Sequence, residues 1–282
     1  MAKDLNIGRL APMGHIYRFY PRGDFFASAA ELGFRQVDLW TCGTHYLLEP
    51  DFRADVGPLR DELRGYGLTA ACVTPEQTCP RPYQMAAREP ALRARAERYW
   101  RNAVLTAHDL ACDKVLITSG WGFYSEPRED AFRRAEDMVG SLCALAEGYG
   151  VCLCMETLSP QSTNLVNTLD DLSRMERAVA SPSFAVTVDI DTVLNAGEDV
   201  QAYFDRFGSR VLLCHFMDNK PGFLGHLAWG DGESDPGKLL ETFAANGYTG
   251  PFSLEYTLPK YFRDPHAVYA RTMNILKPYF QA

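Results

Sequence analysis

Strand-like and helix-like segments alternate along this chain, and this alternation limits its possible folds more than any other feature. The expected strands are short apolar runs at Leu5–Leu10, Arg35–Trp40, Leu68–Thr74, Lys114–Ser119, Val151–Glu156, Phe184–Asp189, Val211–Phe216 and Phe252–Tyr256. The expected helices follow them at Gly23–Leu32, Arg53–Gly65, Arg88–Leu110, Arg128–Tyr149, Thr168–Val179, Asp199–Phe207, Pro236–Asn246 and Pro265–Tyr279. A helix after every strand predicts an α/β fold with a parallel sheet.

Eight such units in 282 residues are typical of a single (β/α)8 TIM barrel, which usually needs about 250 residues. We therefore expect one catalytic domain over residues 1–282. A doubly wound open sheet is the competing architecture. No Gly-x-Gly-x-x-Gly follows the first expected strand, which argues against a dinucleotide-binding version of that sheet.

Composition argues against several kinds of partner. The net charge is -8 and there is no basic stripe, so we expect binding to neither nucleic acid nor an anionic membrane. No apolar run is long enough for a membrane span, and the first residues do not resemble a signal peptide. The eight cysteines include no Cys-x-x-Cys, and we interpret them as buried thiols of a cytoplasmic protein.

Four consecutive expected strands end on a residue that can bind a metal: Glu156, Asp189, His215 and Glu255. In a TIM barrel the chemistry lies at the C-terminal ends of the strands. Side chains alternate between the two faces of a strand, so all four can point toward the barrel axis. The residues two positions earlier would then also point inward, at Cys154, Thr187, Leu213 and Ser253. The opposite parity would direct Leu153, Val186, Val188, Leu212, Phe252 and Leu254 toward the helices.

Three carboxylates and one imidazole converging on a small space predict a divalent metal site. Without a cation the clustered acids would repel one another and take up protons. Ligands that are mostly oxygen suit Mn²⁺, Mg²⁺ or Co²⁺ better than a closed structural zinc site. The alternative is that these acids form separate salt bridges.

The chain resembles the xylose-isomerase-like sugar epimerases, and within them the fructoselysine 3-epimerase and ketose 3-epimerase group, which includes the D-tagatose and D-allulose enzymes. The resemblance spans essentially the whole chain and is strongest after residue 150. The matching stretches are Met155–Pro160, Thr163–Val166, Val188–Asp189, Asp199–Phe207, His215–Asp218, Gly230–Glu233 and Gly247–Gly250 leading to Glu255–Tyr256.

The resemblance implies a metal-dependent isomerase acting on a small-molecule sugar. Glu156, Asp189, His215 and Glu255 would hold a Mn²⁺-like ion. Glu156 and Glu255 would also stand on opposite faces of substrate C3 and invert it through a cis-enediolate. Dimers or tetramers of identical chains are implied as well.

Three positions depart from the family pattern: Ser162 replaces a substrate-binding Glu, Thr192 a His, and Pro221 an Arg. These changes favour a modified or conjugated ketose over a free ketohexose. Ser162 and Thr192 remain candidate substrate contacts. His15, Trp121 and His226 follow expected strand ends and are further candidates, with covering of the barrel mouth as the structural alternative.

Two other functions are compatible with this sequence. The same centre could enolise a 3-keto glycoside and eliminate its aglycone, as in C-glycoside deglycosidases that have a small partner subunit. A non-catalytic barrel that only binds sugar is the second. Apurinic endonucleases of this fold use more His ligands and a basic surface, and this chain lacks both.

Overall fold

A nearly closed barrel of parallel strands forms the centre of the molecule. The computed structural model describes residues 5–77 and 83–281. Its large sheet has eight strands in the order β1-β10-β9-β8-β7-β6-β5-β2. These strands are β1 (Leu10–Pro12), β2 (Gln36–Thr41), β5 (Thr69–Pro75), β6 (Lys114–Ile117), β7 (Cys152–Met155), β8 (Phe184–Asp189), β9 (Val211–His215) and β10 (Phe252–Leu254). A parallel bridge between Met13 and Asp38 links β1 to β2. The predicted (β/α)8 barrel is confirmed, and the open doubly wound sheet is wrong.

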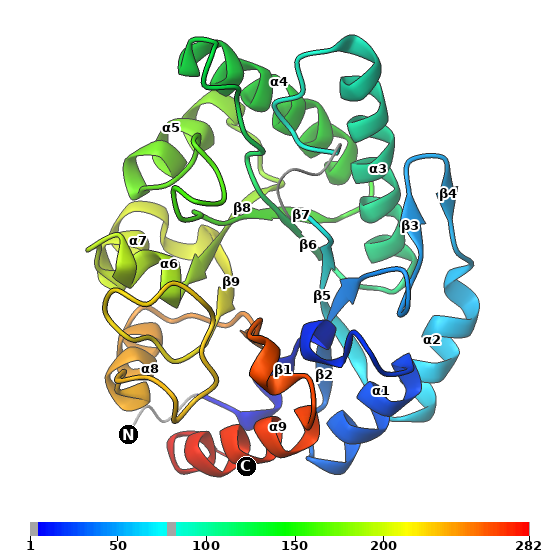
Figure 1. Ribbon diagram of the computed structural model, residues 1–282, viewed down its shortest axis with the longest axis vertical. Coiled ribbons are helices and arrows are strands. Elements are labelled where there is room, and N and C mark those ends of the chain that lie inside the picture. Colours follow the sequence, from blue (N-terminus) through cyan, green and yellow to red (C-terminus); the bar gives the residue numbers. More distant parts are fainter. Residues whose placement is uncertain (1–4, 78–82, 282) are drawn as a thin grey trace.

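Helices surround the strands, as the view down the barrel shows (Figure 1). They are α1 (Arg22–Glu31), α2 (Val56–Gly65), α3 (Pro90–Asp109), α4 (Arg128–Glu147), α5 (Leu169–Val179), α6 (Ile190–Asn195), α7 (Val200–Phe207), α8 (Pro236–Ala245) and α9 (Pro265–Leu276). Within the described ranges, no helix is both long and apolar enough to cross a membrane. The seven described cysteines are free thiols, and Cys79 lies outside the described residues.

Three local features differ from the sequence-based expectation. The expected strand Leu5–Leu10 is wrong, because the Asn6 side chain accepts a hydrogen bond from the Gly8 amide and starts a 3-10 turn, η1 (Ile7–Arg9). The expected helix at Arg53 begins at Val56, where Asp55 caps it. Before it lies an unpredicted hairpin of β3 (Leu48–Glu49) and β4 (Phe52–Arg53).

The inner and outer faces of the strands follow the predicted alternation with one exception. Cys154 and Leu213 belong to a cluster inside the barrel, together with Cys72, Leu116 and Ala185. Five of the six residues of opposite parity pack in the core between sheet and helices. Leu212 is the exception and packs against the interior cluster. The pairing shifts there, because Val186 pairs with Val211 whereas Thr187 pairs with Leu213, and this bulge leaves Leu212 out of the alternation.

A buried acid that sequence reasoning did not identify ties the barrel together below its mouth. Asp38 on β2 is fully buried. It accepts hydrogen bonds from Thr74 on β5 at 2.6 Å and from Ser253 on β10 at 2.7 Å. Burial raises the pKa of Asp38 to about 6. The network therefore links strands on both sides of the point where the sheet closes.

Gly120 positions the loop that follows β6, and this generates a prediction. Its φ is +69°, and an added Cβ would lie 2.5 Å from Gln84 Oε1 and 2.7 Å from the Met85 amide nitrogen. Gly150 has a similar φ of +66° but nothing within 4 Å. We expect Gly120→Ala to lower the free energy of unfolding by about 2–4 kcal/mol and Gly150→Ala by only about 1 kcal/mol. Urea denaturation measures both, and equal losses would contradict the close packing at Gly120.

Candidate metal centre

Four ionisable side chains meet at the C-terminal end of the barrel. Asp189 and His215 are the last residues of β8 and β9, and their Cα atoms are register partners. Glu156 and Glu255 follow the last residues of β7 and β10 by one position. Each strand thus delivers one group to the same end of the sheet, and one ligand atom from each of the four lies within 4.8 Å of all the others.

The imidazole of His215 lies at the centre of this cluster. Its Nδ1 atom is 2.8 Å from Glu255 Oε2, 3.1 Å from Glu156 Oε2 and 3.3 Å from Asp189 Oδ2. Asp189 and His215 are fully buried, and Glu156 nearly so. Three carboxylates therefore surround one buried imidazole nitrogen, and Glu255 is partly exposed.

The surroundings shift the pKa values of these groups strongly. Burial raises the pKa of Glu156 to about 7. Burial would raise that of Glu255 too, but the His226 and His215 imidazoles hold the pKa of Glu255 well below its usual range. Burial would lower the pKa of His215, yet the Glu255 and Glu156 carboxylates raise it well above the ordinary value. When no cation is bound, protons and charged imidazoles therefore compensate the negative charge of the carboxylates.

The cluster fits a divalent cation by its chemistry and its dimensions. Ligands at about 2.1 Å from an ion lie up to about 4.2 Å from one another, close to the spacing observed. Glu156 Oε2 is buried and accepts no hydrogen bond of ordinary geometry from the described residues. An acceptor left this way costs free energy unless a cation or donor reaches it.

A cavity of about 460 Å³ opens above the cluster, and Glu156 and Glu255 line it. Four of the five predicted substrate contacts line it as well: His15, Ser162, Thr192 and His226. Trp121 does not; it lines a smaller neighbouring pocket. The structure therefore groups four of these candidates around one space and places the fifth beside it.

The two histidines of the cavity have opposite electrostatic environments. His226 Nδ1 lies 3.3 Å from Glu255 Oε2, and its Nε2 lies 3.6 Å from Asp189 Oδ2. Burial would lower the pKa of His226, but the Glu255 and Asp189 carboxylates raise it to about 10. Burial lowers the pKa of His15 to about 4. One ring is thus a cationic donor and the other a neutral group.

Other functional candidates come from segments without a recognisable pattern. Asp191 lines the cavity and accepts hydrogen bonds from Asn219 Nδ2 at 2.9 Å and Asn195 Nδ2 at 3.1 Å. It lies on α6, which the sequence analysis missed because Asp189 both ends β8 and caps this helix through the Thr192 amide. Gln77 also lines the cavity, from the segment after β5, of which residues 78–82 lie outside the described residues.

The protonation of this cluster predicts that metal binding depends on pH. With the pKa of Glu156 near 7 and that of His215 raised well above 6.5, a cation must displace protons from the cluster, and it must displace more of them at pH 6 than at pH 8. Mn²⁺ affinity should therefore rise as the pH increases from 6 to 8. Calorimetry in buffers of different ionisation enthalpy measures affinity and proton release together.

The exposed Glu147 at the end of α4 provides the control for this measurement. Glu147→Gln should show the same pH dependence of Mn²⁺ affinity and proton release as the wild type. Glu156→Gln should no longer release the proton that Glu156 loses when the ion binds. An affinity that is flat between pH 6 and 8, with no proton released, would contradict the electrostatic description of the centre.

Comparison with known proteins agrees with this architecture. The family model described as "Xylose isomerase-like TIM barrel" matches residues 26–279. Fructoselysine 3-epimerase of Shigella flexneri is 26% identical over 247 residues, which are 87% of this chain and 88% of that protein. L-ribulose-5-phosphate 3-epimerase UlaE of Shigella flexneri serotype 5b is 26% identical over 176 residues, 62% of this chain and 61% of that protein.

A solved structure titled as a D-tagatose 3-epimerase-like protein has the same fold. Its TM-score is 0.79 at 20% sequence identity, and the alignment covers 96% of each chain. The resemblance to sugar epimerases inferred from the strand-end motifs is confirmed, and these relatives bear names of isomerase-class enzymes. The chain belongs to the xylose isomerase-like TIM barrel family.

Proposed function

We propose that this protein is a divalent-metal-dependent epimerase that inverts C3 of a ketose or ketosamine. The observation that carries the proposal is the convergence of Glu156, Asp189, His215 and Glu255 within 4.8 Å, at the floor of a cavity large enough for a sugar. The names of the curated relatives, a fructoselysine 3-epimerase and an L-ribulose-5-phosphate 3-epimerase, support the same reaction class.

These four side chains would hold the ion, for which Mn²⁺ is our first candidate and Mg²⁺ or Co²⁺ the alternatives. When bound, such an ion polarises the substrate carbonyl and stabilises negative charge on its oxygens, which makes the neighbouring C–H more acidic. The remaining chemistry is proton transfer, and the chain supplies two carboxylates for it.

Glu156 and Glu255 are the acid–base pair in this proposal. They extend from β7 and β10, which β8 and β9 separate, so they reach the cavity from different sides. One carboxylate removes the C3 proton and the other returns a proton to the opposite face, which inverts the centre. The reaction runs in both directions, so each residue serves as base in one direction and as acid in the other.

Neighbouring polar groups would orient the sugar. His226 is a donor beside Glu255, and His15 is fixed through Nδ1 to the Tyr256 carbonyl at 3.1 Å. The Thr192 amide donates to Asp189 Oδ1 at 2.9 Å, which orients that carboxylate. Ser162 presents a hydroxyl on the facing loop. These contacts can hold sugar hydroxyls on several sides.

Substitution of the two glutamates tests the proposal. We expect Glu156→Gln and Glu255→Gln each to lower kcat for C3 epimerisation at least about 10³-fold, because an amide cannot transfer the proton. Exchange of solvent deuterium into C3, measured by NMR over a panel of ketoses and ketosamines with Mn²⁺, follows the proton transfer directly. Glu147→Gln is the matched control and should retain the wild-type rate.

The same experiment separates the other functions. A sugar-binding barrel without catalysis would gain thermal stability from the ketose but exchange no deuterium. A C-glycoside deglycosidase would release an aglycone from a 3-keto glycoside and co-purify with a small partner chain. Near-normal exchange in either glutamine variant would rule out the two-carboxylate mechanism.

A further inference from the structure

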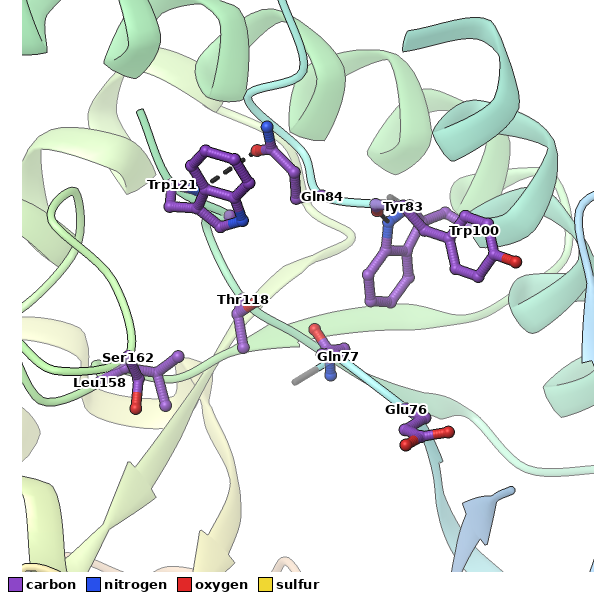
Figure 2. A pocket seen from close by; sticks show the side chains of 10 residues that line it. Glu76, Gln77, Tyr83, Gln84, Trp100, Thr118, Trp121, Leu158 and Ser162 are labelled. Carbon is purple, nitrogen blue, oxygen red and sulfur yellow. Dashed lines mark hydrogen bonds between the residues drawn. The ribbon is translucent and has the colours of Figure 1, made fainter. Parts of the chain in front are cut away.

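A small pocket opens beside the main cavity, on the side of β5 and β6 (Figure 2). We call it the Trp121 pocket; it is lined by Glu76, Gln77, Tyr83, Gln84, Trp100, Thr118, Gly120, Trp121, Leu158 and Ser162. Gln77, Thr118, Leu158 and Ser162 also line the main cavity, so the two spaces adjoin. None of the four residues of the metal centre borders the Trp121 pocket.

Two buried polar atoms of this pocket have no hydrogen-bond partner among the described residues: Trp121 Nε1 and Gln77 Oε1. Figure 2 shows both facing the space between the two side chains. The orientation of the Gln77 amide is fixed, because its Nε2 donates to the Leu116 carbonyl at 3.2 Å. The pocket therefore offers one donor and one acceptor, and each is destabilising while it is buried and unpaired.

Size and charge limit what can satisfy these two atoms. The Trp121 pocket has a volume of about 20 Å³, room for one water-sized group, whereas the main cavity has about 460 Å³. Neither space is lined by a lysine or arginine from the described part of the chain, and the Trp121 pocket has the carboxylate of Glu76 in its wall. A phosphate group is too large for the Trp121 pocket.

We infer that the Trp121 pocket receives a single hydroxyl of an unphosphorylated ketose, at the end of the sugar remote from C3. A hydroxyl is both an acceptor and a donor, so it can accept from Trp121 Nε1 or donate to Gln77 Oε1. The inference rests on the proposed function, since it assumes that the reacting carbons lie at the metal centre. It makes Trp121 and Gln77 determinants of substrate specificity.

Binding to the Mn²⁺-loaded enzyme tests this inference without requiring turnover. The probes are D-fructose, D-tagatose, D-allulose, D-sorbose and the ketosamine fructoselysine, with their 5-deoxy, 6-deoxy and 6-phosphate forms, and calorimetry gives each Kd. For the ketose that binds most tightly, loss of the correct hydroxyl should weaken binding about 10- to 100-fold. The 6-phosphate should bind at least as weakly as that deoxy sugar.

Trp121→Phe removes the donor and keeps the aromatic ring. In this variant the preference for the hydroxylated sugar over its deoxy form should fall below about 3-fold. The matched control is Trp229→Phe, because Trp229 lies outside both spaces and its Nε1 already donates to the Phe216 carbonyl at 3.2 Å. Trp229→Phe should retain the wild-type preference even if it lowers stability.

Three outcomes would overturn the inference: an undiminished preference in Trp121→Phe, tighter binding of a 6-phosphate, or no binding of any of the five sugars. An ordered water that fills the pocket in every complex would produce the first of these. Deuterium exchange at C3 reports separately on the proposed function. If the preference for the hydroxylated sugar depends on Trp121 but no deuterium is exchanged at C3, the inference about the pocket holds and the proposed epimerase function is wrong.

Discussion

Repulsion among three carboxylates around one buried imidazole nitrogen is the constraint on which this structure depends. Glu156, Asp189 and Glu255 each place an oxygen within 3.3 Å of His215 Nδ1. Like charges this close in a low-dielectric site are unfavourable unless protons or a cation balance them. A parallel barrel can impose the arrangement, because adjacent strands end side by side and their interiors pack tightly beneath the cluster.

Much of this arrangement could be predicted from the sequence, because it follows from the regular repeat of a strand. Each proposed ligand ends or directly follows an apolar run, and the twofold alternation correctly placed Cys154 and Leu213 inside the barrel. The alternation failed at Leu212, where a bulge depends on pairing with β8 and leaves no mark in the sequence. Strand periodicity therefore predicted the positions of the four proposed ligands but not the bulge at Leu212.

Residues away from the strand ends were harder to predict. Gln77 and Asp191 line the cavity, but no spacing rule links them to the strand ends. Asp38 lies within a strand and looks like a surface acid until Thr74 and Ser253 are seen to donate to it. Trp121 was expected at the cavity and lines the neighbouring pocket instead. Such positions depend on contacts between distant segments, which a single sequence does not encode visibly.

Anomalous diffraction from crystals of the wild-type protein soaked in Mn²⁺ shows whether the four side chains bind one ion. We predict one strong peak at the barrel mouth, at about 2.0–2.3 Å from an oxygen of Glu156, Asp189 and Glu255 and from a nitrogen of His215. A peak elsewhere, or four side chains that keep their mutual contacts with no ion among them at saturating Mn²⁺, would contradict it.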